Sequence, residues 1–280
     1  MNSVYLYLVA PLHTGGTTQE GNLLGIARES HTNLPYIPSS TIRGRLRASV
    51  ADMSTRVQLF GPELKNLENP QFLAEYKSKT GKGLTQLEQG DIWIGDASLL
   101  WLPVPSLSHG IIWISCPMLL RRWARFNSNE PNIPAAYSSN LSATSAVYLK
   151  DAILKKGTLQ PWQNWQNFVP KNSTAIDIER VLVLPDQHCA TLMQMSLWRQ
   201  VKVKLDEHKS VEGGFRYEEA IPPDTLMYFP WGITSQANGT AQTSQTEFEG
   251  LLSNNQILQI GGQESLGRGF VQQWLAAKSN

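Results

Sequence analysis

Residues 38–53 read "PSSTIRGRLRASVADM". Serines at 39 and 40 are typical helix N-caps. Four apolar residues follow at spacings of four, four and three, which is the period of one helix face: Ile42, Leu46, Val50 and Met53. The segment therefore predicts an amphipathic helix over about 40–54, directly after a long loop.

Three arginines occupy the opening of this predicted helix, namely Arg43, Arg45 and Arg47. Helix openings normally favour acidic side chains, because the helix dipole is positive there. With Ser39 and Ser40 beside free backbone N–H groups, the helix start could hold a phosphate. We therefore expect these residues to contact a phosphate; the alternative is a solvated helix with ordinary surface arginines.

Alternating and continuous apolar runs outside this segment predict several strands. The runs lie at 4–9, 91–106, 110–115, 179–184, 199–205, 255–260 and 269–274. Pro117 is suited to the first turn of a helix over 118–126. Loops are expected at 13–25, 127–147 and 161–175, and a polar linker at 234–246.

The order near the start is strand, helix, strand, strand, helix and then strands. We therefore predict an α+β fold with a ferredoxin-like (RRM-like) βαββαβ palm, large insertions and a thumb-like β-hairpin. One domain is expected over 1–280, with insertions at about 127–175 and 206–250.

The charge, hydrophobic content and cysteines of the chain limit the classes of function that it can have. The 280 residues carry a net charge of +1 and are 41% hydrophobic, so any basic site must come from local clustering. The two cysteines, Cys116 and Cys189, lack CxxC spacing and are expected to be reduced core residues of a cytoplasmic protein. We expect no signal peptide, no membrane span, no metal site and no cofactor.

A second candidate site is "IGGQESLGRGF" at 260–270. Its glycines allow close backbone approach to a sugar-phosphate, and Arg268 adds charge. The glycines concerned are Gly261, Gly262, Gly267 and Gly269. The alternative is a hairpin turn that needs positive φ.

A third candidate is a hairpin arm within 202–223, with Gly213 and Gly214 expected near its tip. Phe215 and Arg216, next to these glycines, could wedge between bases or stack on them. The alternative is a surface hairpin whose aromatic side chains rest on the body.

Histidines give weaker signals. His13 follows the first strand and could act as a general base or a ligand, although a structural or RNA-contacting role fits its loop position better. His31 is expected in a loop, and His109, His188 and His208 show no ligand spacing with one another. No Ser/His/Asp assembly can be placed.

Together, an ordered set of segments resembles the RAMP superfamily of CRISPR–Cas effector proteins, and most closely the Cmr-type backbone subunits of type III complexes in the seventh Cas family. The segments are "APLHTGG", "RESHTNLPYIPSSTIRGRLR", "LFGPE", "DASLLWLPVPSLSHGIIWISCP", "VEGGFRYEEAIPPDTLMY" and "LQIGGQESLGRGF". The resemblance implies subunits that stack in a filament along a CRISPR guide RNA and bind single-stranded target RNA beside other type III subunits. It also implies a palm that holds the guide and a thumb hairpin that kinks it.

The resemblance also implies roles for particular residues. Ser39, Ser40 and Arg43 match the family's Ser-Ser-x-Lys/Arg guide-binding motif. The four glycines of 261–269 match its glycine-rich motif, and 211–219 is the candidate thumb.

One departure from the family concerns cleavage of the target RNA. Active relatives carry an aspartate five residues before the arginine that matches Arg28, and here that position is Leu23. Asn22 and Leu24 beside it cannot replace an acid. The expected subunit therefore binds RNA without a cutting site of its own.

Three alternatives stay open. Glu20 could serve a metal-dependent endoribonuclease that cuts target RNA. His13 could process guide precursors, as in the sixth Cas family. A metabolic enzyme on a ferredoxin-like fold would need a catalytic set that the sequence does not offer.

Overall fold

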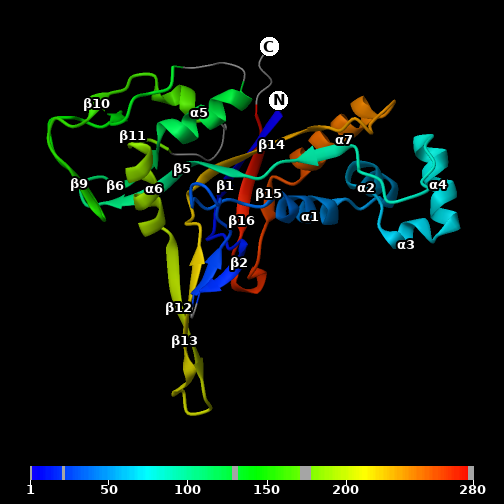
Figure 1. Cartoon of the computed structure of the whole chain (residues 1–280), viewed down its shortest axis with the longest axis horizontal. Helices are drawn as coiled ribbons and strands as arrows, with labels where there is room; N and C mark the ends of the chain where they lie inside the picture. The colour runs from blue at the N-terminus through cyan, green and yellow to red at the C-terminus, as the bar shows by residue number, and fades with distance from the viewer. Residues whose placement is uncertain (1, 21–22, 128–131, 171–177, 277–280) are drawn as a thin grey trace.

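The computed structural model describes residues 2–20, 23–127, 132–170 and 178–276, without the side chains of 16–20. It has a mixed α/β architecture built on two sheets. Figure 1 shows an elongated body with a long two-stranded arm that projects from it. Among the described residues, no helix is long and apolar enough to cross a membrane.

The larger sheet has the strand order β10-β7-β11-β6-β5-β14-β1-β16-β15, with β4 beside β14 and the β8–β9 hairpin beside β5. The bounds of its strands are β1 Asn2–Leu8, β4 Ile92–Ile94, β5 Ser98–Ser106, β6 Gly110–Ser115, β7 Ser138–Ser139, β8 Val147–Leu149, β9 Ala152–Leu154, β10 Gln160–Pro161, β11 Val181–Val183, β14 Leu226–Ile233, β15 Ile257–Gln259 and β16 Phe270–Leu275.

The smaller sheet has the order β12-β13-β3-β2 and forms the arm and its base. Its strands are β2 Gly15–Glu20, β3 Leu23–Ile26, β12 Trp198–Leu205 and β13 Val211–Ala220. The helices are α1 Ser39–Ser49, α2 Met53–Phe60, α3 Leu64–Leu67, α4 Pro70–Thr80, α5 Pro117–Phe126, α6 Asp186–Met195 and α7 Ala241–Asn254, with 3-10 turns η1 Trp165–Phe168 and η2 Glu264–Leu266.

β1 lies inside the larger sheet, between β14 and β16 and antiparallel to both. Leu6 and Leu8 are fully buried in the main core together with Ile42 of α1 and Phe248 of α7. Tyr5, on the alternate face, is buried in a second core with aromatic residues such as Trp101. Because both faces of β1 are covered, its sequence is almost continuously apolar.

The strand predictions for 4–9, 110–115, 179–184, 199–205, 255–260 and 269–274 are confirmed to within a few residues, as is the helix that begins at Pro117. The long strand expected over 91–106 is divided into β4 and β5. Cys116 and Cys189 are free and buried.

The prediction of a linker over 234–246 is wrong at its C-terminal end, because α7 begins at Ala241. The hydroxyls of Thr240 and Ser244 donate to the buried Asp91 carboxylate at 2.6 and 2.7 Å. These polar residues therefore anchor a helix to β4. β14, inside the segment expected to be an insertion, lies between β5 and β1.

The helix expected over about 40–54 is also shorter than predicted. α1 ends at Ser49, and Val50 is extended with φ −82° and ψ 113°. Asp52 then caps α2 by accepting from the Thr55 backbone N–H at 2.7 Å. Met53 thus opens a second helix and is 37% exposed, so it does not continue the apolar stripe.

The loop expected over 13–25 contains β2 and β3, which pair with each other and, through β3, with β13 of the arm. Asn22 lies outside the described residues. The arm itself turns at 206–210, where the Asp206 carboxylate accepts from the backbone N–H groups of His208 and Ser210. Gly213 and Gly214 lie inside β13, short of the tip, where the strand register shifts.

Candidate nucleic-acid interface

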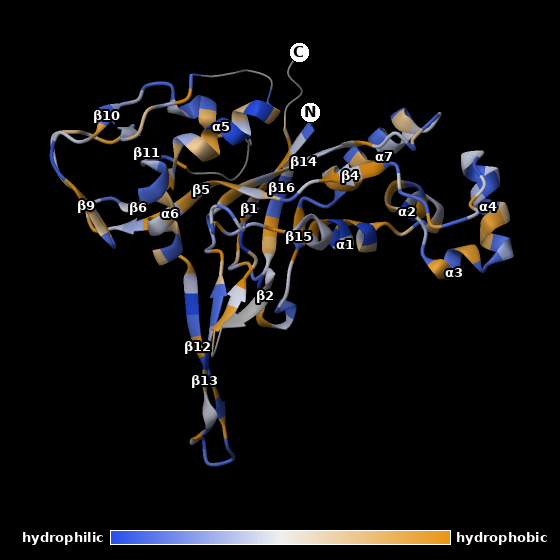
Figure 2. Cartoon of the chain, viewed as in Figure 1, coloured by the Kyte–Doolittle hydropathy of each residue, from blue (hydrophilic) through white to orange (hydrophobic). Residues whose placement is uncertain are grey.

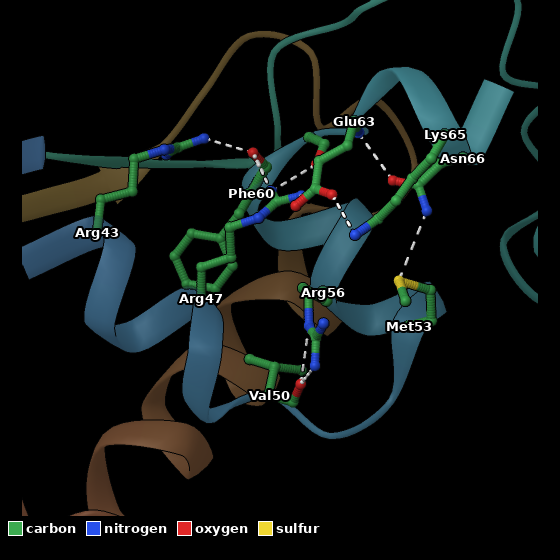
Figure 3. A network of polar contacts seen from close by, with 10 residues as sticks. Arg43, Arg47, Val50, Met53, Arg56, Phe60, Glu63, Lys65 and Asn66 are labelled. Carbon is green, nitrogen blue, oxygen red and sulfur yellow. Dashed lines mark hydrogen bonds and ion pairs between the residues drawn. The ribbon is translucent and has the colours of Figure 1, made fainter.

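Two of the three α1 arginines bond to the protein itself (Figure 3). Arg43 donates to the backbone carbonyls of Phe60 at 2.5 Å and Ile92 at 3.2 Å. Arg47 donates to the carbonyls of Phe60 and Gly61 at 3.1 and 2.7 Å, and to the Glu63 carboxylate at 3.1 Å. Both guanidinium groups therefore hold the C-terminal end of α2 and the chain that follows.

Arg43 is half-buried, and its guanidinium lies 5.4 Å from the centroid of the Phe60 ring. Burial, followed by the positive charge of Arg47, lowers the pKa of Arg43 from its ordinary value. Arg45 differs, because it is exposed and makes no ion pair with the described residues. Of the three, Arg45 is the one that faces solvent.

The start of α1 already has an anionic partner. The Ser39 backbone N–H donates to the Asp96 carboxylate at 2.6 Å, and Ser40 is exposed beside it. A carboxylate at this point satisfies a helix N–H group and complements the dipole. The phosphate expected here would therefore share the helix start with Asp96.

The glycine-rich turn packs against the chain around His13. Gly261 has φ +82°, and a Cβ there would lie 2.4 Å from the His13 carbonyl oxygen. Gly262 donates its N–H to the same oxygen at 2.9 Å. Gly269 has φ +79°, and its Cβ would lie 1.9 Å from the Ile260 carbonyl oxygen. Gly261 and Gly269 therefore require glycine for backbone conformation and close approach within the protein.

Gly267 differs from Gly261 and Gly269 because a Cβ there would meet nothing within 4 Å, although its φ is +71°. His13 is buried, at 5% exposure, and its Nδ1 lies 2.8 Å from the Glu219 carbonyl oxygen. The imidazole is therefore packed between the glycine-rich turn and the base of the arm.

Arg268 is 4% exposed and belongs to a buried ionic cluster at the base of the arm. Its guanidinium donates to the Glu218 carboxylate at 3.1 Å and to Gln200 at 2.9 Å, and it also bonds to Gln263. The group lies 4.5 Å from the Trp198 ring centroid. In this arrangement Arg268 joins the glycine-rich turn to β12 and β13, away from solvent.

Glu218 is fully buried and pairs with two further cations. Lys202 lies 2.8 Å and Arg216 lies 3.1 Å from its carboxylate oxygens. Burial pushes the pKa of Glu218 upward, but the hydrogen bond from Lys202 and the surrounding positive charge leave it below its ordinary value. The carboxylate is thus ionised and surrounded by excess positive charge.

The neighbouring carboxylate, Glu219, points to the opposite face of β13 and is also buried. Arg28 and Arg199 donate to it at 2.7 and 2.9 Å. Five cations therefore surround two carboxylates at the base of the arm: Arg28, Arg199, Lys202, Arg216 and Arg268.

Along the arm, one face carries cations that reach solvent. Lys204, with its side chain 75% exposed, bonds to Glu212 at 2.8 Å, and Arg216 is 60% exposed.

An open pocket of about 560 Å³ lies at the register shift, lined by Lys202, Val203, Lys204, Gly213, Gly214, Phe215 and Arg216. Phe215 is 49% exposed, and its ring meets that of Tyr217 edge to face at 5.5 Å. The predicted pair Phe215 and Arg216 therefore lies at a basic, partly aromatic pocket.

Sequence reasoning missed Lys202 and Lys204 as candidates. The signal was available in "VKVKL" at 201–205, because strict alternation in a strand separates apolar from charged side chains onto two faces. The buried pair Glu218 and Glu219 gave no comparable signal, since its partners come from four separate segments of the chain.

Leu23 is part of the smaller sheet. It pairs with Tyr217 of β13 in parallel and with Glu20 of β2 in antiparallel register. Glu20 is therefore a backbone neighbour of Leu23. Among the described residues, no group of three or more His, Cys, Asp or Glu side chains is arranged to hold a metal ion.

Comparison with known proteins identifies relatives along the whole chain. The family model of the RAMP superfamily matches residues 5–272. A protein named "CRISPR system Cmr endoribonuclease Cmr4" from Pyrococcus furiosus is 29% identical over 302 aligned positions, which cover 99% of this chain and 96% of the relative.

Solved structures share the fold. The crystal structure of oligomeric Cmr4 from Pyrococcus furiosus has a TM-score of 0.69 and 24% identity, with both chains fully covered. A chain of the type III-B Cmr-beta complex bound to cognate target RNA has a TM-score of 0.71 and 18% identity, over 98% of this chain and 96% of that one. The match of the family model over residues 5–272 makes this chain a member of the RAMP superfamily, as its motifs predict.

Proposed function

We propose that this chain is an RNA-binding backbone subunit of a type III CRISPR–Cas effector complex that acts in the cytoplasm. Copies would bind a CRISPR guide RNA and single-stranded target RNA beside other subunits of the complex. The single observation that carries this proposal is the relative of nearly equal length named "CRISPR system Cmr endoribonuclease Cmr4". The exposed cations of the arm are consistent with it, because phosphate contacts dominate RNA affinity.

Within this proposal, the palm is the ferredoxin-like unit made by β1, α1, β5, β14, α7 and β16. The four strands have the order β16-β1-β14-β5, and each neighbouring pair is antiparallel. Helix α1 follows β1 and α7 follows β14 in the chain, which is the βαββαβ order. The segment between β5 and β14 is then one large insertion that includes the arm, and the arm is the thumb.

The residues proposed to bind RNA are those that the fold leaves accessible: Ser40 and Arg45 on α1, and Lys202, Lys204, Phe215 and Arg216 on the arm. A phosphate on the cations and a base against Phe215 would match the chemistry of the pocket. A further set of predicted residues is proposed to shape this surface through the internal contacts described above: His13, Ser39, Arg43, Arg47, Gly261, Gly262, Arg268 and Gly269.

The subunit is proposed to bind target RNA without cutting it at its own position. Leucine at 23 offers neither charge nor a hydrogen-bond acceptor to position or deprotonate the 2′-hydroxyl. Leu23 lies in β3 beside Tyr217, so it continues an apolar surface.

A second candidate function is target cleavage through Glu20. It is favoured by one observation, that Glu20 pairs with Leu23 directly across the β2–β3 hairpin. A carboxylate from this position would need to reach the same phosphate as the aspartate of active relatives.

Two measurements test the proposal. Purification of the chain with a co-expressed CRISPR guide should give an excess of absorbance at 260 nm that nuclease treatment removes; its absence would contradict guide binding. A complex with all other cutting sites disabled should leave target RNA intact opposite this subunit. Cleavage that persists in the parent chain and disappears in Glu20→Gln would replace the first proposal with the second.

A further inference from the structure

Each cation that lines the open pocket of the arm already faces a carboxylate of the chain. Lys204 pairs with Glu212 at 2.8 Å. Lys202 and Arg216 both pair with Glu218, at 2.8 and 3.1 Å. Figure 2 shows hydrophilic residues along the arm, from its base near β12 to its turn. A phosphate in the pocket would therefore compete with two carboxylates for the same three cations.

The two carboxylates differ in their freedom to move. The Glu212 side chain is 55% exposed, so it can turn into water when a phosphate approaches Lys204. The Glu218 side chain is 0% exposed, and the guanidinium of Arg268 holds it from the buried side at 3.1 Å. Separating a buried carboxylate from its cations carries a large penalty. Glu218 therefore stays in place when a ligand enters the pocket.

Lys202 and Arg216 belong to both environments. Their side chains are 25% and 60% exposed and line the pocket, while their charged ends reach the buried Glu218. Lys202 is paired with Arg216 across β12 and β13, and Gln200 is paired with Glu218 two residues along. These side chains share one face of the arm, and such neighbours lie about 7 Å apart along a strand. A ligand bound by the two cations is thus close to the Glu218 carboxylate.

The charge of Glu218 acts on the pocket at neutral pH. Burial raises the pKa of this carboxyl, but the hydrogen bond from Lys202 and the surrounding cations leave the pKa below its ordinary value. Three cations, Lys202, Arg216 and Arg268, surround one carboxylate, so the cluster has a net charge of +2. Arg268 is not a lining residue of the pocket. The negative charge therefore lies nearer to the ligand than the cation behind it.

From this arrangement we propose that Glu218 is an internal competitor of the RNA phosphate and limits the affinity of the arm for RNA. The inference rests on the proposed binding of RNA in the pocket, and it adds a regulation of that site. Bound RNA shares Lys202 and Arg216 with the carboxylate and does not displace it. The shared cations give faster release of the RNA, because affinity differences between related complexes lie mostly in the dissociation rate.

Glu218→Gln tests the proposal, because the amide keeps the shape of the side chain and removes its charge. The matched control is Glu219→Gln. Glu219 is also buried, but it points to the opposite face of β13, and its partners Arg28 and Arg199 do not line the pocket. Each protein is freed of nucleic acid, checked for folding by circular dichroism, and titrated with a short fluorescent single-stranded RNA at several salt concentrations.

Glu218→Gln should bind this RNA about fivefold more tightly than the parent chain at about 0.15 M salt, because a like charge about 7 Å from the phosphate is removed. Its dissociation rate should fall by a similar factor. The slope of log affinity against log salt should steepen by about 0.7, since Lys202 and Arg216 are then free to neutralise one more phosphate. Glu219→Gln should keep the affinity of the parent within about twofold and the same slope.

A second variant covers the case in which the single change prevents folding. Glu218→Gln combined with Arg268→Gln removes both members of the buried pair, which is milder than leaving one charge buried alone. This double variant should also bind RNA more tightly than the parent, because the pocket keeps its cations and loses the nearest negative charge.

Three results would overturn the inference. Folded Glu218→Gln, or the folded double variant, could bind RNA no more tightly than the parent chain. Glu219→Gln could gain as much affinity as Glu218→Gln, which would assign the effect to overall charge. A parent chain without measurable affinity for the RNA would contradict the proposed function itself, and the inference with it. A parent chain that binds RNA, with an unchanged Glu218→Gln, would contradict the inference alone.

Discussion

The arginines of α1 and the cations of the arm are both clustered in sequence, but they face different partners. Arg43 and Arg47 donate to three carbonyl oxygens around the end of α2. Lys204 and Arg216 keep side chains that are 75% and 60% exposed. The difference teaches that an arginine cluster at a helix start indicates a phosphate site only when the fold offers no internal acceptors.

The glycines of the body and of the arm differ in the same way, and this gives the largest expected effect. Gly269→Ala should lower the free energy of unfolding by more than about 3 kcal/mol, because the new Cβ would lie 1.9 Å from the Ile260 oxygen. Gly214→Ala should cost about 1 kcal/mol, since φ of +89° is strained but nothing lies within 4 Å. Urea denaturation measures both. Equal losses would mean that the arm is packed as tightly as the body.

The second prediction compares one cation from each region. Arg43→Met should lower the free energy of unfolding by about 1–2 kcal/mol, because the Phe60 and Ile92 carbonyls lose a charged donor. Lys204→Gln should change it by less than about 0.5 kcal/mol, since the side chain is mostly exposed. Chemical denaturation of the two variants and the parent chain measures both changes in the free energy of unfolding. An Arg43→Met variant with an unchanged free energy of unfolding would contradict the structural role assigned to that arginine.

The smallest effect is a pH dependence confined to the body. The hydrogen bond from Lys79, followed by that from the Thr55 backbone N–H, lowers the pKa of Asp52 from 3.8 to about 2. Ionised Asp52 therefore stabilises the folded state fully above about pH 4, and this contribution fades as the pH falls to about 2. It should amount to less than about 1 kcal/mol, because the pair is half-exposed.

Asp52→Asn should flatten the acid dependence of unfolding between those pH values and leave stability at pH 7 within about 1 kcal/mol. Lys204→Gln on the arm serves as the control and should keep the acid dependence of the parent. An Asp52→Asn curve that parallels the parent at all pH values would assign the acid sensitivity to other carboxylates.

Local pattern was enough to predict the elements that pack by their own periodicity. Val4, Leu6 and Leu8 predict β1, and Pro117 predicts the start of α5. The same reasoning extended α1 too far, because the apolar stripe does not reveal that Val50 is extended and that its carbonyl accepts from Arg56 at 2.5 and 2.9 Å. The apolar period of a sequence does not show where one helix ends and the next begins.

Long-range contacts explain what sequence reasoning missed at the site. The acceptor of Arg43 at Ile92 lies 49 residues away, and the Glu219 partner of Arg28 lies 191 residues away. Leu23 becomes a neighbour of Tyr217 only through the parallel pairing of β3 with β13. Motif order predicted the family, but the division between accessible and internal cations depends on these pairings.

The central claim is that RNA affinity comes from the cations of the arm. The direct measurement is the salt dependence of binding to a short single-stranded RNA for the parent chain, Arg43→Met, and Lys204→Gln combined with Arg216→Gln. Each phosphate contact contributes about 0.7 to the slope of log affinity against log salt, so the double arm variant should flatten it by about 1.4. Arg43→Met should keep the parent slope. A flattened slope in Arg43→Met together with an unchanged slope in the double arm variant would contradict the account and return the phosphate site to α1.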